Sequence, residues 1–351
     1  MEKNIILCIL LLMGFGACKK DTPDIPPPTT LPPNNSANIG KGVFITSEGG
    51  FGHSNASLTY WSYADGKVIA NVFDTLSNPK LGDVCQSMSL FNGKAYVVVN
   101  NSGKIEMMDP KTLRSVATIS GLNSPRYFLG LNDKAYVTDF KANAVTVLNL
   151  SSNTVSKNIP CKGWTEELLL AENRVFVTNL AKEYVYVINT ATDAIEDSIR
   201  VGFGSGSIKR DKNGKIWVLC GGDASKKLKP GLYQIDPVSK TVSFSLDFSN
   251  TSDKPSHLCI NGTGDTLYFL NKGVYRMPVN SKSLPTEAFI SSGDNLFYGL
   301  GIHPGTSEIY VCDAVDYVQK GWVYVFRPSD GAKTTSLQAG IIPGNFCFYI
   351  P

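Results

Sequence analysis

The sequence predicts an all-β fold, a seven-bladed β-propeller in which the C-terminal strand closes the first blade. An aromatic residue returns seven times at intervals of 40 to 52 residues, each time inside a short apolar strand pattern. Turn-forming residues separate these patterns. A repeat of this length indicates one supersecondary unit used many times over. The repeated aromatic residues are Phe44, Tyr96, Tyr136, Phe176, Trp217, Tyr268 and Tyr310.

The repeat at residues 86–122 shows the structure of one unit. Asn92-Gly93 links two apolar runs, which is a strong β-hairpin signal. Turns at residues 101–103 and 109–112 add a third and a fourth strand. Four antiparallel strands repeated radially form a propeller blade. The same order of strands and turns recurs in residues 124–163, 164–202, 203–249, 255–293 and 295–340.

The first repeat lacks one strand, because residues 41–73 supply only three. Residues 343–350 are similar to the strands that open other blades, such as residues 124–129. We therefore expect the C-terminus to complete blade 1 and so to remove the open edge of the ring. A sandwich of eight strands would not explain seven regular repeats.

The N-terminus predicts export and lipidation. Residues 1–17 have the pattern of a signal peptide: Lys3 precedes an apolar run, which is shorter than the roughly 20 residues that span a bilayer. Gly16-Ala17-Cys18 resembles a bacterial lipobox, which implies a lipid on Cys18 and attachment to a membrane. The alternative is ordinary secretion with an incidental cysteine.

Residues 18–40 are rich in proline and polar residues, a composition that favours an extended tether, and residues 41–351 form the propeller. The net charge of +3 at pH 7 is too small to indicate nucleic-acid binding. No zinc-type spacing of Cys and His is present, so we expect no metal site and no cofactor. Cys220, Cys259, Cys312 and Cys347 lie in strand patterns and are expected to pack as buried apolar residues.

Residues that could bind a ligand gather on one face of the predicted ring. The loops that lead into the inner strands, and those between second and third strands, converge there. Three of these loops are long, at residues 48–58, 221–231 and 313–321. Polar residues at the ends of second strands either face a ligand or cap turns. They are Glu48, Asn100, Asp139, Asn179, Asn271 and Asp313.

Six segments resemble the YncE-like seven-bladed propeller lipoproteins of gut Gram-negative anaerobes. They are GVFITSEGGFGHSNASLTYW, LGDVCQSM, VVVNNSGKI, SPRY, the loop at residues 313–317 and GIIPGNFCF. The resemblance covers the chain from residue 41 onward. That group includes the BtuG-type surface lipoproteins, which capture cobalamin and pass it to a TonB-dependent outer-membrane transporter. The resemblance implies an outer-membrane lipoprotein exposed at the cell surface.

Cobalamin suits a surface that combines polar and aromatic groups, because its corrin rim carries amides and its faces are apolar. If the resemblance holds, the topology makes eight residues candidate ligand contacts. They are Arg126, Tyr127, Trp164, His257, Tyr298, Asp313, Tyr317 and Phe346.

Three functions from different classes follow. The first is a non-enzymatic protein that captures a small molecule, cobalamin being the leading candidate, for a transporter. The second is a surface propeller that binds protein or glycan and no small ligand. The third is a hydrolase or lyase that uses paired carboxylates, although none of the three histidines lies in a catalytic motif. We expect the chain not to be an enzyme.

Overall fold

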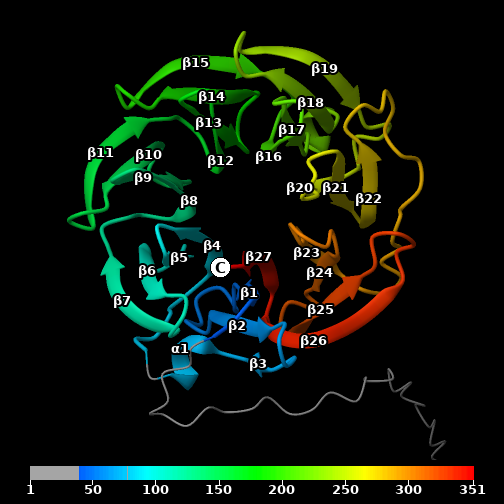
Figure 1. Cartoon of the computed structure of the whole chain (residues 1–351). Helices are drawn as coiled ribbons and strands as arrows, with labels where there is room; N and C mark the ends of the chain where they lie inside the picture. The colour runs from blue at the N-terminus through cyan, green and yellow to red at the C-terminus, as the bar shows by residue number, and fades with distance from the viewer. Residues whose placement is uncertain (1–38, 77) are drawn as a thin grey trace, which may run out of the picture.

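The computed structural model describes residues 39–76 and 78–351. These residues form seven antiparallel sheets arranged in a ring, so the predicted seven-bladed propeller is confirmed (Figure 1). The predicted signal peptide, Cys18 and most of the tether lie outside the described residues. Within the described part, the backbone N–H of Ile39 donates to the carbonyl of Lys111 at 2.9 Å, so contacts with the ring begin before residue 41.

In blades 2 to 7 the innermost strand comes first in the chain and the strands then follow outward. Blades 2 to 4 consist of β4 (Cys85–Phe91), β5 (Lys94–Val99), β6 (Lys104–Asp109) and β7 (Arg114–Ile119); β8 (Pro125–Leu131), β9 (Lys134–Asp139), β10 (Ala144–Asn149) and β11 (Thr154–Pro160); and β12 (Thr165–Ala171), β13 (Arg174–Asn179), β14 (Tyr184–Asn189) and β15 (Ala194–Arg200).

Blades 5 to 7 continue the ring with the same order. They consist of β16 (Ser205–Arg210), β17 (Ile216–Cys220), β18 (Gly231–Asp236) and β19 (Thr241–Asp247); β20 (Ser256–Ile260), β21 (Thr266–Asn271) and β22 (Gly273–Pro278); and β23 (Phe297–Ile302), β24 (Ile309–Asp313), β25 (Lys320–Phe326) and β26 (Lys333–Ile341). A short 3-10 helix, η1 (Ala224–Lys226), lies in the long loop of blade 5.

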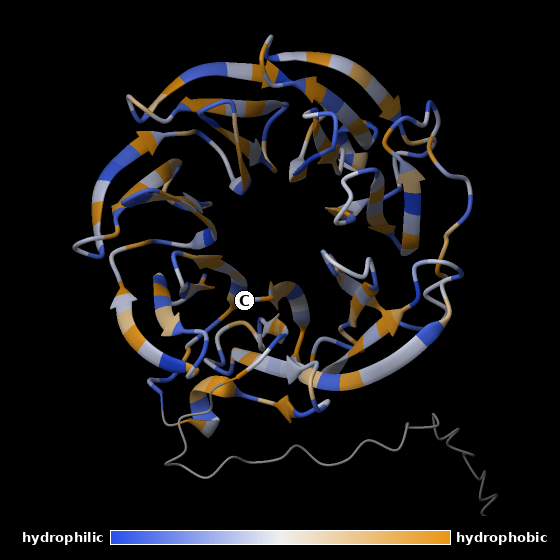
Figure 2. Ribbon diagram, in the orientation of Figure 1, coloured by the Kyte–Doolittle hydropathy of each residue, from blue (hydrophilic) through white to orange (hydrophobic). Residues whose placement is uncertain are grey.

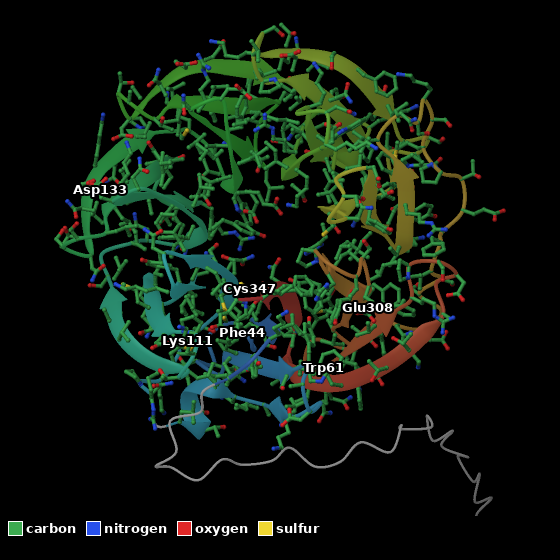
Figure 3. All side chains as sticks on the ribbon, in the orientation of Figure 1. Phe44, Trp61, Lys111, Asp133, Glu308 and Cys347 are labelled. Atoms are coloured by element: carbon green, nitrogen blue, oxygen red, sulfur yellow. The ribbon has the colours of Figure 1, made fainter. Side chains whose placement is uncertain are left out.

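Blade 1 joins the two ends of the described chain. Its strands, from the axis outward, are β27 (Pro343–Tyr349), β1 (Gly42–Ser47), β2 (Ser57–Ser62) and the two-residue β3 (Val68–Ile69), followed by the short helix α1 (Val72–Thr75). Phe44 of β1 is paired with Cys347 of β27, and Figure 3 shows them together in this blade. The predicted closure by the C-terminal strand is therefore confirmed.

Apolar side chains hold neighbouring blades together. One buried cluster lies at each interface between blades of the described ring. All seven repeated aromatic residues belong to these clusters and are at most 3% exposed, which explains their period. Apolar and polar residues alternate along the strands in Figure 2, and outer strands such as β15 expose one side to solvent.

Blade 6 departs from the predicted four strands. Its sheet has three, and the segment after β22 pairs with it only through an isolated bridge between Val274 and Ile290. The segment contains Pro285 and begins just after Pro278. Proline lacks the N–H that a sheet ladder needs, so a regular fourth strand is disfavoured there.

The cysteine prediction was right for Cys220 and Cys312, which are fully buried. It was right in part for Cys259 and Cys347, which pack against apolar clusters but are only partly buried, because they lie on inner strands next to the axis. All six cysteines of the described residues are free thiols.

The two faces of the ring are set by strand direction. We call the face on which the inner strands begin the lead-in face, because it carries the loops that precede them. The inner strands end on the opposite face, at the hairpins to the second strands, and we call it the hairpin face. The turn at Lys111 joins a third to a fourth strand and so lies on the hairpin face, as does Gly42 at the start of β1. The chain therefore joins the ring on the hairpin face. No helix within residues 39–76 and 78–351 is long and apolar enough to cross a membrane.

Deleting residues 343–351 should destabilise the whole ring, because β1 would lose its inner partner and two inter-blade clusters would open. We expect the melting temperature of the chain from residue 39 to fall by about 10 °C or more. Deletion of the exposed Pro351 alone is the control. An unchanged melting temperature after the longer deletion would contradict the closure.

Candidate functional site

Every inner strand of the described ring carries a β-bulge near its start on the lead-in face. In β4, for example, Cys85 and Ser87 pair with the consecutive residues Val99 and Val98, which leaves Gln86 as an extra residue. A bulge redirects a side chain and is often found beside a functional site. The residues at the seven bulges are Gln86, Arg126 with Tyr127, Glu166 with Glu167, Gly206, His257 with Leu258, Tyr298, and Gly344.

Most of these bulge residues line one cavity at the mouth of the central channel, which we call the cup. Its volume is about 330 Å³. It is lined by Arg126, Tyr127, Glu166, Glu167, Gly206, His257, Tyr298 and Gly344, together with Glu48, Asn345 and other residues of the lead-in loops. Four of the eight predicted contacts, Arg126, Tyr127, His257 and Tyr298, therefore meet in one site.

The strongest interaction in the cup is a two-point ion pair between Arg126 and Glu166. The guanidinium Nε and Nη2 donate to the two carboxylate oxygens at 2.9 and 2.6 Å. Nη1 of Arg126 donates to Gln86 Oε1. Burial alone would lower the pKa of Arg126, but Glu166 outweighs it and keeps the guanidinium charged. The pair and the Gln86 contact together join three neighbouring blades and present a rigid polar wall.

A second polar contact lies across the cup between blades 1 and 7. The hydroxyl of Tyr298 donates to Glu48 Oε1 at 3.0 Å. Burial raises the pKa of the Glu48 carboxyl, and the Tyr298 hydrogen bond partly opposes that shift. Gly344 lies beside both groups: a Cβ placed there would be 3.6 Å from the Tyr298 ring and 3.7 Å from Glu48 Oε1. The absence of a side chain at residue 344 leaves this corner of the cup open.

His257 adopts a left-handed backbone conformation, with φ of +54°. This is uncommon for a residue with a side chain, and here it coincides with the β-bulge of β20. Burial, with smaller effects from Lys209 and Arg126, lowers the pKa of His257 to about 4. The imidazole is therefore neutral at pH 7, and Nδ1 lies 3.1 Å from the hydroxyl of Ser256.

A second cavity of about 410 Å³ continues the channel below the cup. Tyr127, Glu167, His257 and Asn345 line both cavities. Phe346, one of the predicted contacts, lines only this lower cavity, where its ring packs edge-on against Tyr310 with 5.7 Å between centroids. Phe346 therefore lies deeper in the channel than the predicted ligand face.

Trp164 and Tyr317 lie at the edge of the cup. The Trp164 ring stacks on Phe140 with centroids 4.6 Å apart, and its Nε1 donates to Glu166 Oε2 at 2.8 Å. Its contribution to the cup thus acts through Glu166. Tyr317 is 47% exposed, and its ring meets the edge of Tyr298 at 5.7 Å.

Asp313 does not lie at the surface of the cup. It is 1% exposed, and Oδ1 accepts hydrogen bonds from the backbone N–H groups of Leu296 and Val315, both at 2.9 Å. Oδ2 lies 3.3 Å from the hydroxyl of Tyr324. The side chain caps a loop, and its placement as a ligand contact is corrected to a structural role.

The other polar residues at the ends of second strands mostly cap loops as well. Asp139 accepts from the backbone N–H groups of residues 123, 124, 141 and 142. Asn179 accepts from Ala181 N at 3.0 Å, and Asn271 accepts from Lys254 N at 3.2 Å. Glu48 alone among the six lines the cup. Capping explains the set better than a polar ring around a ligand does.

Several cup residues were missing from the predicted contacts: Glu48, Glu166, Glu167, Gly206, Gly344 and Asn345, as was Gln86, which contacts Arg126. A usable signal existed. Arg126 lies 40 residues from both Gln86 and Glu166, and Gly206 follows at the same interval. Residues at one offset in successive blades occupy equivalent places in the ring. Within residues 39–76 and 78–351, no group of His, Cys, Asp and Glu side chains is arranged to hold a metal ion.

The fold and the cup define a seven-bladed propeller with a polar cavity at its axis. Residues 41–348 match the family described as a domain of unknown function, DUF5074. Because the match spans nearly the whole ring, the chain belongs to this family. None of the curated proteins compared with the chain matches it.

Solved structures share the fold at low sequence identity. A quinonprotein alcohol dehydrogenase-like protein from Bacteroides thetaiotaomicron superposes with a TM-score of 0.70 at 14% identity, over 88% of this chain and 78% of that one. The periplasmic gluconolactonase of Pseudomonas aeruginosa has a TM-score of 0.66 and 14% sequence identity, over 88% of this chain and 100% of that one. AztD from Citrobacter koseri has a TM-score of 0.56 and 10% sequence identity, over 87% of this chain and 96% of that one. These likenesses show the seven-bladed propeller fold, and fold does not determine function.

The low pKa of His257 makes stability depend on pH. The neutral imidazole is favoured in the folded state, so its contribution is full above the usual pKa of 6.5 and is lost as the pH falls toward about 4. We expect acidification across this range to lower the melting temperature less in His257→Gln than in the unaltered protein. The exposed His53→Gln is the control. The same dependence of melting temperature on pH in His257→Gln and in the unaltered protein would contradict the lowered pKa of His257.

Proposed function

We propose that this protein is a non-enzymatic binding protein that captures a small molecule in the cup and delivers it to a TonB-dependent transporter of the outer membrane. The observation that carries the proposal is the convergence of the inner-strand bulges on one cavity. Ligand sites are concave and combine apolar walls with a few fixed polar groups. The cup has such polar groups in Arg126, Glu166 and Glu48, beside the ring of Tyr298.

Cobalamin is the leading candidate for the ligand, on the resemblance to the BtuG-type proteins. The molecule is larger than the cup, so its corrin rim would lie across the mouth and place an amide among the polar groups. Tyr317 and Phe51, which are 47% and 74% exposed on the two long loops of blades 7 and 1, could then cover an apolar face. Aromatic rings are suited to such a contact.

The topology supports a surface-anchored arrangement. The chain joins the ring on the hairpin face at Ile39, whereas the cup opens on the lead-in face. A lipid on Cys18 would thus attach to the opposite side from the cup. Residues 18–40 would then link that lipid to the ring.

A protein- or glycan-binding propeller is the second candidate. The observation that favours it is the exposure of Phe51 at 74% and Val318 at 73% on the lead-in face. They lie on the long loops of the neighbouring blades 1 and 7, and exposed apolar residues can mark an interaction surface. Under this alternative the long loops would bind the partner, and the cup would contribute little.

Calorimetric titration of residues 39–351 with cyanocobalamin tests the leading candidate. We expect binding, and we expect Tyr298→Ala and Tyr317→Ala to weaken it about tenfold or more, which corresponds to about 1.4 kcal/mol. Lys94→Ala, at an exposed position on the hairpin face, is the control. No heat of binding at micromolar protein, or an equal loss from Lys94→Ala, would contradict cobalamin capture at the cup.

A further inference from the structure

Glu48 is the unbalanced charge of the cup. Arg126 is held by both oxygens of Glu166, and Lys209 donates to Glu167 at 2.6 Å, so these four charges neutralise one another. Glu48 forms no ion pair with a lysine or arginine in the described part of the chain, and its one side-chain partner there is the Tyr298 hydroxyl. A carboxylate without a cation in a partly buried site is costly.

Two aromatic rings pack beside Tyr298, the hydrogen-bond partner of Glu48. The Tyr298 ring centroid lies 5.7 Å from that of Tyr317 and 6.4 Å from that of His257, with interplanar angles of 84° and 52°. The faces of tyrosine rings attract cations within about 6 Å. His257 is neutral at pH 7, so it adds a ring without adding a positive charge.

The corner also has room. Residue 344, which lies beside both Glu48 and Tyr298, is a glycine and has no side chain. A Cβ at residue 344 would lie at ordinary contact distance from both groups. A side chain at this position would therefore occupy the space next to the carboxylate, which glycine leaves free. Glu48 itself lines the cup, so a small group bound in the cup would lie next to this carboxyl side chain.

From these contacts we infer that the corner formed by Glu48, Tyr298 and Tyr317 binds an organic ammonium group of the ligand. The carboxylate would supply the opposite charge, and the two tyrosine rings would cover the alkyl carbons around the nitrogen. This inference rests on the proposed function in that the cup is taken as the ligand site. Cobalamin carries no ammonium group, so the inference concerns a cationic ligand of the cup other than cobalamin.

Choline is a suitable probe, because its cationic head is small enough for the cup. Its neutral isostere, in which a tert-butyl group replaces the trimethylammonium group, is the matched control. We expect ligand-observed NMR on residues 39–351 to detect choline in the millimolar range, as for other ligands of so few atoms. The isostere should bind about tenfold more weakly or worse, since it keeps the shape and loses the cation–π and Coulomb contributions. Equal affinity for the two compounds, or no choline binding at tens of millimolar, would overturn the inference.

Substitutions separate charge from shape. Glu48→Gln can still accept the Tyr298 hydrogen bond, so the fold should persist while choline affinity falls about tenfold. Gly344→Ala should weaken both probes by filling the corner. Asp133→Asn removes an exposed carboxylate on the hairpin face and should change neither. Unchanged choline affinity in Glu48→Gln would also overturn the inference.

Choline affinity should fall as the pH is lowered through the pKa of Glu48, because the protonated carboxyl no longer attracts a cation. Burial raises that pKa above its usual 4.5, and the charged or titratable groups around it are Tyr298, Arg126, Glu166 and Cys85. The two proposals fail separately. Choline binding without cyanocobalamin binding would support the ammonium corner and reject cobalamin, and the reverse result would reject the corner.

Discussion

The pairing of β27 with β1 is the constraint on which the rest of the structure depends. It joins segments almost 300 residues apart in the chain and turns a row of sheets into a ring. The site uses the same closure. Tyr298 reaches Glu48 across 250 residues of sequence, and the Asn345 amide reaches the carbonyl of Gln86 across 259, at 2.8 Å. Without closure the cup would lack one of its walls.

The ring separates stability from recognition. Apolar clusters between blades bury the repeated aromatic residues, while the bulges at the starts of the inner strands turn other side chains toward the axis. Glycine at the bulges of blades 5 and 1 keeps part of the cup open. Rigid strands support these groups, so the polar contacts are held in place before a ligand arrives, which lowers the entropy cost of binding.

The sequence predicted the architecture well because the aromatic residues that repeat along the chain are the ones that pack between the blades. Phe44, Trp217 and their equivalents are buried at every interface, and the missing first strand pointed to the C-terminus. Local chemistry was harder to predict. Asp313 matches the pattern of an exposed polar residue, yet it satisfies loop N–H groups that only the folded loop brings together. Pro285 disfavours a strand that the repeat alone would require.

The cup shows where a repeat can mislead. Topology selected Arg126 and Tyr298 correctly for the cavity, but it did not show that Arg126 is held by Glu166, or that Glu48 lacks a cation. The contacts of Arg126 depend on the geometry of the bulges. The 40-residue spacing of Gln86, Arg126 and Glu166 indicates these contacts only after the inner strands have been aligned with one another.

Peptide complementation tests the central claim, that ring closure builds both the fold and the cup, most directly. A chain of residues 39–342 would be titrated with a synthetic peptide of residues 343–351, with thermal unfolding and choline binding measured together. The account predicts that the peptide raises the melting temperature in a saturable manner and restores binding at the same concentrations. A chain of residues 39–342 that unfolds at the same temperature with and without the peptide, and binds choline equally well in both cases, would contradict it.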